Sequence, residues 1–288
     1  MMTRGSESGT TLVLGGTGKT GRRVAERLRA RDLPVRIGSR SGEVPFDWED
    51  RSTWLPALHG TSAAYVSFFP DLAVPSAPEA IAAFAELAVS SGTRRLVLLS
   101  GRGEEEAQRA ERALQASGAE WTVLRCSWFM QNFSESFFAE PLAAGELALP
   151  AGDVGVPFVD AEDIADVAVA ALTGHGHAGE VYELTGPRAL THAQVAEEVA
   201  RASGRPVRYV DVPMDTFVSA LAEQAVPPDV VDLLRYLFTE VLVERNAGVG
   251  DGVRRALGRE PGDFAGYARA AAASGAWAEA GGPAALVR

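Results

Sequence analysis

Short apolar runs alternate with amphipathic segments along the first half of the chain. The apolar runs predict strands at residues 11–14, 34–38, 44–46, 63–68, 95–99 and 121–124. The segments between them predict helices at residues 19–31, 52–58, 76–91 and 104–117. Because this alternation is typical of βαβ units, the pattern predicts an α/β fold with a doubly wound parallel sheet covered by helices.

The alternation of apolar runs and amphipathic segments becomes less regular after residue 132. Phe158 and Val159 lead into a helix that Asp160 or Asp163 caps, and residues 180–184 predict a late strand. From residue 191 onward helical patterns dominate, with one more strand at 207–211. We therefore expect a mostly helical C-terminal part, and 288 residues allow either one large domain or a domain with a small lobe attached.

Composition narrows the class of protein. The 288 residues carry a formal charge of -11, which argues against a nucleic-acid surface. Cys126 is the only cysteine, so no intrachain disulfide forms. The first residues, MMTRGSESG, lack the apolar region of a secretory signal, and no apolar run is long enough to span a bilayer. We expect a cytoplasmic protein without a membrane partner, and its oligomeric state stays open.

The stretch GGTGKTGRR at residues 15–23 follows the first predicted strand and opens the first helix. A nucleoside-triphosphate loop needs a glycine where this chain has Val13, so that interpretation fails. The dinucleotide pattern fits, because it requires glycines where the backbone turns and approaches a pyrophosphate. A tight turn without a ligand is the alternative. The candidate cofactor contacts in this loop are Gly15, Thr17, Gly18, Lys19, Thr20 and Gly21.

The second predicted strand indicates which dinucleotide binds. An NAD site usually has a carboxylate at this strand end, whereas residues 36–40 read RIGSR. Arg40, with Ser39 beside it, is placed to pair with a 2′-phosphate, and Arg22 and Arg23 add positive charge at the helix start. The arginines are alternatively solvated surface residues. We expect NADP(H) to be preferred, with NAD(H) as the other candidate.

Several longer stretches resemble the NmrA-like family of atypical short-chain dehydrogenases/reductases. They are LGGTGKTGRRV (14–24), FDWED (46–50), LVLLSG (96–101), WTVLRCSWFMQNF (121–133), PFVDAEDIADVAVAAL (157–172) and 182–213. The resemblance implies a Rossmann domain over 10–132 with parts of 155–185, and a substrate lobe over 133–154 and 186–288. It also implies either an NAD(P)H-dependent quinone or azo-dye reductase or a cofactor-sensing regulator without catalysis.

The usual catalytic dyad of short-chain dehydrogenases is missing. That dyad is Tyr-x-x-x-Lys, and none of the five tyrosines precedes a lysine at this spacing, because Lys19 is the only lysine. The segment GRGEEEAQRAERAL (101–114) also lacks the lysine of isoflavone-type reductases. Quinones suit such a site, since hydride addition gives a stabilised hydroquinone anion that takes a proton from water or a weak donor.

The family resemblance and the strand ends give the remaining site candidates. Ligands of such sheets lie beyond the carboxyl ends of the strands at the switch point, here between the 11–14 and 63–68 strands. Each candidate has an alternative role in core packing, helix capping or the solvated surface. Cofactor contacts are expected at Asp47, Trp48, Phe68, Phe69, Ser100, Gly101 and Cys126, the last of which replaces a proline usual in the family.

Substrate contacts are expected from Arg102 and from an aromatic run that would suit a flat ring system. The run supplies Trp128, Phe129, Met130 and Phe133, and core packing is the default expectation for two of these four side chains. Ser100, Gln131 and Asn132 are the candidate catalytic polar groups. No metal site is expected, because His175 and His177 have no further ligands at a suitable spacing.

The sequence therefore supports two functions of different classes. The first is an NAD(P)H-dependent oxidoreductase that transfers hydride to a quinone or polycyclic aromatic substrate without a Tyr/Lys dyad. Such an enzyme could act in aromatic polyketide biosynthesis, including an oxygen-dependent hydroxylation coupled to reduction. The second is a non-catalytic NADP(H)-sensing regulator of the NmrA type.

Overall fold

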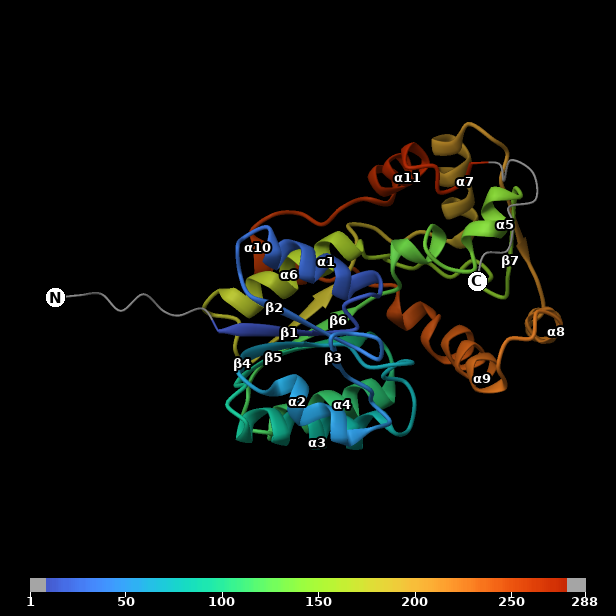
Figure 1. Cartoon of the computed structure of the whole chain (residues 1–288). Helices are drawn as coiled ribbons and strands as arrows, with labels where there is room; N and C mark the ends of the chain where they lie inside the picture. Colours follow the sequence, from blue (N-terminus) through green and yellow to red (C-terminus); the bar gives the residue numbers. More distant parts are fainter. Residues whose placement is uncertain (1–8, 279–288) are drawn as a thin grey trace. The chain divides into compact units, whose positions relative to one another are not determined.

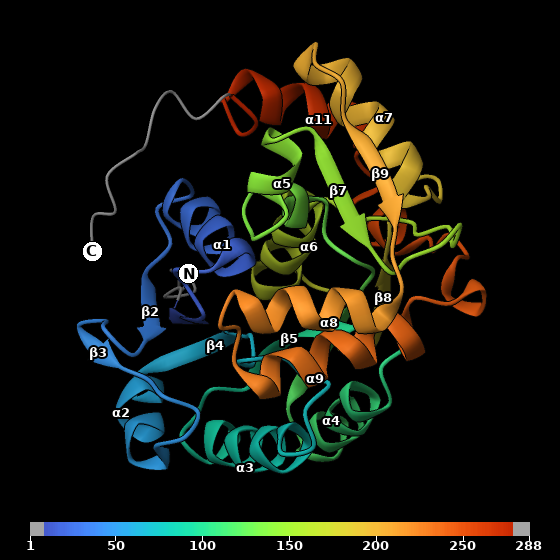
Figure 2. The same ribbon diagram turned by 90° about the vertical axis from the view of Figure 1, so that its right-hand side faces the viewer.

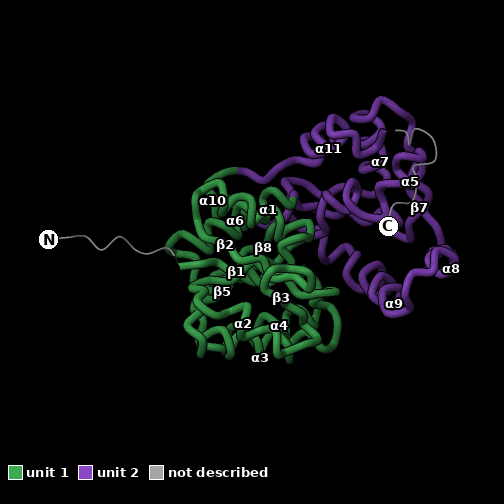
Figure 3. Tube along the Cα trace, in the orientation of Figure 1, with its two compact units in different colours: residues 1–126, 161–184, 251–259 green, residues 127–160, 185–250, 260–288 purple. Residues whose placement is uncertain are grey.

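The computed structural model describes residues 9–278 of the chain, in two compact units. Of the described residues, unit 1 takes 9–126, 161–184 and 251–259. Unit 2 takes 127–160, 185–250 and 260–278 (Figure 3). Each unit has its own hydrophobic core, so each is described by itself.

Unit 1 is built on a parallel sheet of seven strands in the order β3-β2-β1-β4-β5-β6-β8. The strands are β1 (Thr10–Leu14), β2 (Val35–Ser39), β3 (Val44–Pro45), β4 (Thr61–Val66), β5 (Arg95–Gly101), β6 (Glu120–Cys126) and β8 (Glu180–Leu184). The chain runs outward from β1 to β3 and then returns to the other side of β1 at β4. The predicted α/β class and the switch point between β1 and β4 are both confirmed.

Helices cover both faces of this sheet (Figure 1). One face carries α1 (Lys19–Arg29), α6 (Ala161–Thr173) and α10 (Gly252–Leu257), and the other carries α2 (Trp54–Leu58), α3 (Ala77–Ser90) and α4 (Glu105–Ala116). A single-turn 3-10 helix, η1 (Arg51–Thr53), precedes α2. Alternate strand residues such as Leu12 and Leu14 are fully buried with α3 side chains such as Phe84. Burial of apolar side chains on both faces stabilises this layered arrangement.

Unit 2 contains a parallel pair of strands, β7 (Glu146–Leu149) and β9 (Arg208–Asp211), which Figure 2 shows side by side. The sequence predicted β9 but not β7, because the residues of β7 (ELAL) favour helices, whereas β9 (RYVD) contains the strand-favouring residues Tyr and Val. Thr191 and Gln194 form a capping box that starts the helix after β8. The helices of unit 2 are α5 (Ala139–Ala143), α7 (His192–Ser203), α8 (Met214–Glu223), α9 (Pro228–Tyr236) and α11 (Phe264–Ala273), with shorter turns at η2 (Met130–Phe133), η3 (Leu237–Val241) and η4 (Glu244–Asn246).

The two units differ from the predicted domains at two places. Residues 127–132 belong to unit 2, and residues 251–259 belong to unit 1. The second difference arises because α10 packs on α6 and β8. A Cβ on Gly252 would lie 2.5 Å from the Glu183 carbonyl oxygen, so a glycine is needed for α10 to begin there. Within residues 9–278 no helix has the length and apolarity that a membrane span requires.

Candidate functional site

The loop between β1 and α1 depends on its glycines for close backbone packing. Gly15 has a φ of +64°, in the left-handed region that favours glycine. The Gly18 amide donates to the Gly15 carbonyl oxygen at 2.9 Å. A Cβ on Gly21 would lie only 2.2 Å from that same oxygen. The first turn of α1 can therefore lie against the loop only while position 21 is glycine.

The N-terminus of α1 is suited to a bound anion. Gly18 is the N-cap residue and offers no side-chain cap, and the first turn of α1 contains no acidic residue. Amide groups at such a helix start need an acceptor, and the helix dipole favours a negative one. Gly15, Thr17 and Gly18 are exposed. The loop thus fits the pyrophosphate of a dinucleotide, which would be held by the first-turn amides beside Lys19 and Thr20.

The end of β2 presents a cation and an aromatic ring to solvent. Arg40 is exposed, and its guanidinium carbon lies 5.3 Å from the centre of the Phe69 ring. Phe69 itself is 66% exposed. Arg36 is engaged elsewhere, since it donates to the carbonyl oxygens of Ala57 and His59. No carboxylate stands between residues 36 and 42, so this edge suits a 2′-phosphate better than a ribose hydroxyl.

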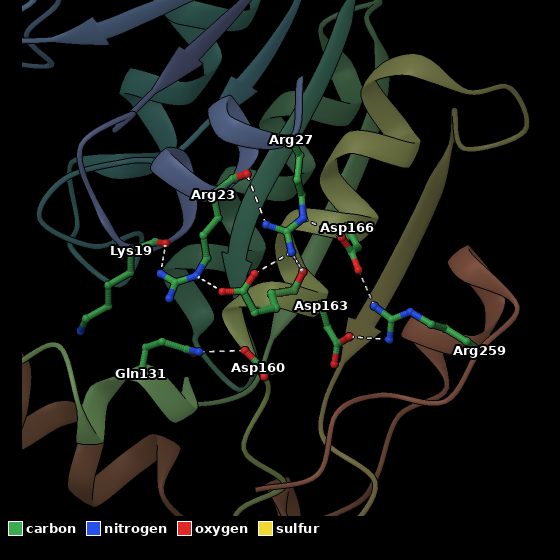
Figure 4. A network of polar contacts seen from close by, with 9 residues as sticks. Lys19, Arg23, Arg27, Gln131, Asp160, Asp163, Asp166 and Arg259 are labelled. Atoms are coloured by element: carbon green, nitrogen blue, oxygen red, sulfur yellow. Dashed lines mark hydrogen bonds and ion pairs between the residues drawn. The ribbon is translucent and has the colours of Figure 1, made fainter. Parts of the chain in front are cut away.

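Arg23, which was expected to add positive charge at the start of α1, forms an ion pair with α6. Its Nε donates to Glu162 of α6 at 2.6 Å, and Nη1 donates to the Lys19 carbonyl oxygen at 2.8 Å. Arg27 binds both Glu162 and Asp166 (Figure 4). The acidic start of α6, expected only to cap that helix, is therefore a set of ion-pair partners that fix α1 against α6.

Two of the expected cofactor contacts, Trp48 and Phe68, belong to an aromatic cluster. The Trp48 ring lies 4.8 Å from the Phe68 ring and 5.3 Å from Phe84, and its Nε1 donates to the Ser67 carbonyl oxygen at 3.1 Å. The Asp47 carboxylate accepts from the Glu49 amide at 3.1 Å. Trp48 and Phe68 are both half-buried. They are thus brought together as a wall that is continuous with the core.

Ser100 and Arg102 are held in a buried polar network at the end of β5. The Ser100 hydroxyl donates to Glu111 of α4 at 2.6 Å, and Glu111 also binds Arg125 at 2.5 Å. Arg125 and Arg102 both pair with Glu183 of β8, at 3.2 Å and 3.3 Å. The Ser100 hydroxyl therefore donates its proton to the Glu111 carboxylate, and Arg102 forms an ion pair with Glu183.

Cys126 ends β6, where its backbone is in register with Gly101 and Leu184. Its side chain is buried, and its sulfur lies 3.4 Å from the Leu124 carbonyl oxygen. Burial, and then the nearby Glu104 carboxyl, raise the pKa of this thiol well above its usual value. A protonated buried thiol is a poor nucleophile, so Cys126 can line the site but not attack a substrate.

The aromatic run that begins unit 2 divides between surface and core. Trp128 is half-buried, 5.2 Å from the Phe238 ring, and Phe129 is also half-buried. Phe133 is fully buried and contacts the rings of Phe138, Phe158 and Phe264, so its predicted role as a substrate contact is replaced by a core role. Sequence spacing carried no signal that separated these two roles.

The candidate catalytic amides also lie at the start of unit 2. The Gln131 side chain is buried and donates to the Asp160 carboxylate at 2.7 Å (Figure 4). Asn132 is half-buried, and its carbonyl oxygen accepts from Ser136. Gln131 therefore fixes the segment that precedes α6.

Two carboxyl groups that the sequence did not single out lie beyond the strand ends of unit 1. Asp71 follows β4, and Glu104 follows β5 immediately before α4. Glu104 is 8% exposed, and burial raises the pKa of its carboxyl well above the usual value, helped by the charge of Asp71. The two residues are separated by 32 residues in the sequence. In the sequence alone, Asp71 is typical of a loop and Glu104 is typical of the start of a helix. Only the pairing of β4 with β5 brings them together.

The two histidines considered as metal ligands have other surroundings. The His177 Nδ1 lies 2.8 Å from the Tyr182 hydroxyl, and His175 is exposed. Among residues 9–278 no three His, Cys, Asp or Glu side chains gather as metal ligands would.

The seven-stranded sheet and the glycine loop define unit 1 as a dinucleotide-binding domain of the Rossmann type. Residues 106–248 match the NmrA-like family. An NAD(P)H azoreductase of Xenophilus azovorans is 32% identical, over 91% of this chain and 98% of that protein. The chain therefore belongs to the NmrA-like family.

Two further comparisons agree with this assignment. An agroclavine dehydrogenase of Claviceps fusiformis is 30% identical, over 90% of this chain and 96% of that protein. The crystal structure of an NADPH-dependent quinone oxidoreductase of Escherichia coli, complexed with NADPH, has a TM-score of 0.74. The match covers 90% of this chain and 98% of the quinone oxidoreductase chain, with 21% sequence identity. The relatives include NAD(P)H-dependent reductases, and the structural match supports the fold.

Proposed function

We propose that the chain is an NADPH-dependent reductase that transfers hydride to a quinone or a related polycyclic aromatic substrate. The observation that supports the cofactor part of the proposal is the N-terminus of α1, which has no side-chain cap and follows a loop in which Gly15 has a positive φ and Gly21 has no room for a Cβ. Arg40, exposed at the end of β2, is the proposed 2′-phosphate partner. When bound, NADPH supplies the hydride, and unit 1 holds it in place.

The substrate half of the proposal rests on what the chain lacks and on its relatives. Without a Tyr/Lys dyad, the best substrates are those whose reduced anion is already stabilised, as a hydroquinone anion is. A relative named above is an NAD(P)H azoreductase, and a protein of the same fold is an NADPH-dependent quinone oxidoreductase. We assign substrate selection to unit 2, where Trp128 and Phe129 offer partly exposed aromatic faces.

We extend the proposal to one biosynthetic role. A reduced hydroquinone reacts readily with oxygen, so a reductase of this kind would support hydroxylation of an aromatic polyketide. The expected signature is consumption of oxygen together with NADPH, and incorporation of labelled oxygen into the product. Reduction without incorporation would limit the activity to quinone reduction.

A non-catalytic NADP(H) sensor is the second candidate, because the absent dyad is equally consistent with it. One experiment separates the two. Purified protein is mixed with NADPH and a panel of naphthoquinones and anthraquinones, and absorbance of NADPH is followed. We expect NADPH oxidation with at least one acceptor. Tight NADPH binding without oxidation by any of them would favour the sensor.

The cofactor preference is tested on the same protein with Arg40→Met. Loss of a charged hydrogen bond to phosphate is expected to weaken NADPH binding by about tenfold or more and NADH binding by less than about threefold. Arg31→Met, at an exposed position just after α1, is the matched control and should change neither. Equal losses for both cofactors would contradict the assignment of Arg40.

A further inference from the structure

Unit 1 contains a carboxyl pair that the proposed function does not yet use. Asp71 and Glu104 follow β4 and β5, two neighbouring parallel strands, so both lie at the carboxyl edge of the sheet. This is the edge at which dinucleotide-binding sheets hold their ligands. The glycine loop reaches the same edge, since a Cβ on Gly15 would lie 3.3 Å from Ser67, the residue after β4. The two carboxyl groups are close enough for each to shift the pKa of the other.

Glu104 is the buried member of the pair. It is 8% exposed, and its Oε2 has no hydrogen-bond partner among the described residues. Its carboxyl group lies against Gly101, where a Cβ would come within 2.0 to 2.1 Å of all three carboxyl atoms. Glycine at position 101 therefore makes room for this side chain. An ionised carboxylate buried without a donor is costly, whereas a protonated one can donate to a neighbouring carboxylate.

Asp71 is the natural acceptor for that proton. Asp71 is half-buried, and burial raises the pKa of its carboxyl above the usual value. The Ala73 amide, which donates to Oδ1 at 2.9 Å, and the Glu104 carboxyl act in the opposite direction and favour the ionised form of Asp71. The carboxyl of Glu111 of α4 also acts on Glu104, and it raises the pKa of Glu104 in the same direction as Asp71 does. Burial and these neighbours raise the pKa of Glu104 well above its usual range, so the carboxyl holds its proton.

The other acidic groups near this edge are less suited to give up a proton. The Ser100 hydroxyl donates to Glu111, and the Cys126 thiol is buried with a raised pKa. Tyr65, the penultimate residue of β4, is fully buried, and burial raises the pKa of its hydroxyl far above the ordinary value. A carboxylic acid with a raised pKa is closer to neutral pH than any of these, which is what efficient general acid catalysis requires.

We propose that Glu104 is the catalytic acid that protonates the reduced substrate, and that Asp71 is the positioning residue that keeps the proton on Glu104. The inference rests on the proposed reductase function. A quinone accepts hydride, and with it two electrons, from bound NADPH, which leaves NADP⁺ and a hydroquinone monoanion. The O–H bond of the Glu104 carboxyl then breaks as a new O–H bond forms on the anion. Water returns a proton to Glu104, so one NADPH and one proton are consumed per quinone reduced.

The resting proton is tested first, without cofactor or substrate. Infrared spectra of the full-length protein should show a protonated carboxylic acid at pH 7 that Glu104→Gln removes. Glu105→Gln, at the exposed neighbouring position, is the matched control and should leave the band unchanged. A wild-type spectrum at pH 7 without a protonated carboxyl, or a band that survives in Glu104→Gln, would overturn the proposal.

The catalytic role is tested by pH profiles of kcat with NADPH and a naphthoquinone. Glu104→Gln should lower kcat about tenfold or more and remove the fall in rate at alkaline pH, with an unchanged Kd for NADPH. Asp71→Asn leaves the proton donor Glu104 in place but removes the negative charge of Asp71 beside it. Because that charge raises the pKa of Glu104, the fall in rate at alkaline pH should begin at lower pH in this variant. If the pair had a purely structural role, both variants would be less stable than the wild type but would keep its pH profile of kcat. That result would refute the assignment.

The two proposals fail in different ways. If wild-type protein shows no turnover while the infrared band behaves as expected, the reductase function fails and the proton-holding pair stands as a structural fact. If NADPH is oxidised by quinone and Glu104→Gln matches the wild type in rate and pH profile, the reductase function stands and Glu104 is not its acid.

Discussion

Protonation of the buried His192 side chain is costly in the folded state, which makes the stability of unit 2 sensitive to acid. It is the first residue of α7 and is fully buried, with the Phe158 ring 5.5 Å and the Phe133 ring 6.0 Å from its own. Neither ring nitrogen has a hydrogen-bond partner among the described residues. Burial therefore lowers the pKa of His192 from 6.5 to about 4. The native state holds this imidazole neutral and resists its protonation.

This predicts a loss of stability as pH falls from about 6.5 toward 4. Over that interval the unfolded chain binds a proton at His192 and the folded chain does not, so the free energy of unfolding decreases, by up to about 3 kcal/mol. His192→Leu should flatten the dependence between pH 7.5 and pH 5 in urea denaturation. His175→Leu, at an exposed position, is the control and should keep the wild-type slope. Equal slopes in both variants would refute the role of His192.

Among the elements, α1 is the one whose position matters most for the cofactor. Arg23 and Arg27 on α1 reach Glu162 and Asp166 on α6, and Arg259 reaches Asp163 and Asp166 from just beyond α10. Burial raises the pKa of Glu162, but its hydrogen bonds from Arg23 and Arg27 outweigh this and hold that pKa below its usual value. Stability from this contact is therefore present at neutral pH and is lost as pH falls through that lowered pKa.

We expect Glu162→Gln to lower the free energy of unfolding at pH 7 by about 1 kcal/mol, a modest value because the side chain is 49% exposed and partly screened. The loss should shrink at acidic pH, where the wild-type carboxylate is protonated as well. Glu79→Gln breaks the more exposed Arg51 pair and is the control, with an expected cost below about 0.5 kcal/mol. Denaturation in urea at pH 7 and pH 3.5 measures both, and equal costs would contradict the argument.

The elements also differ in how well the sequence predicts them. The central strands of unit 1 were predictable because parallel strands buried on both faces are continuous apolar runs, as the buried residues Leu96 to Leu98 show. The strand β7 was not, because its residues Glu146–Leu149 (ELAL) favour a helix and its partner strand lies some 60 residues later. The glycine loop was predicted from local spacing alone. The Asp71 and Glu104 pair was missed, because its two members meet only through strand order.

At the scale of the whole chain, neither unit is a continuous segment. The backbone passes between the units after residues 126, 160, 184, 250 and 259. Unit 1 therefore gains α6, β8 and α10 late in the sequence. Cys126 depends on this assembly, because its strand β6 is flanked by β5 on one side and by the late strand β8 on the other. Exposure of its thiol thus reports the opening of unit 1.

Labelling of Cys126 should consequently measure cofactor binding by unit 1. Binding to the native state alone, at a free NADPH concentration 100 times its Kd, stabilises that state by about 2.7 kcal/mol and should slow thiol labelling roughly 100-fold. The measurement uses a thiol reagent in mild urea, with the single cysteine giving one labelled site per chain. Gly21→Ala is the matched control. A Cβ there would collide with the Gly15 carbonyl oxygen, so NADPH should give this variant little protection at the same concentration. If saturating NADPH left the wild-type labelling rate unchanged, the cofactor would not be held by unit 1 as proposed.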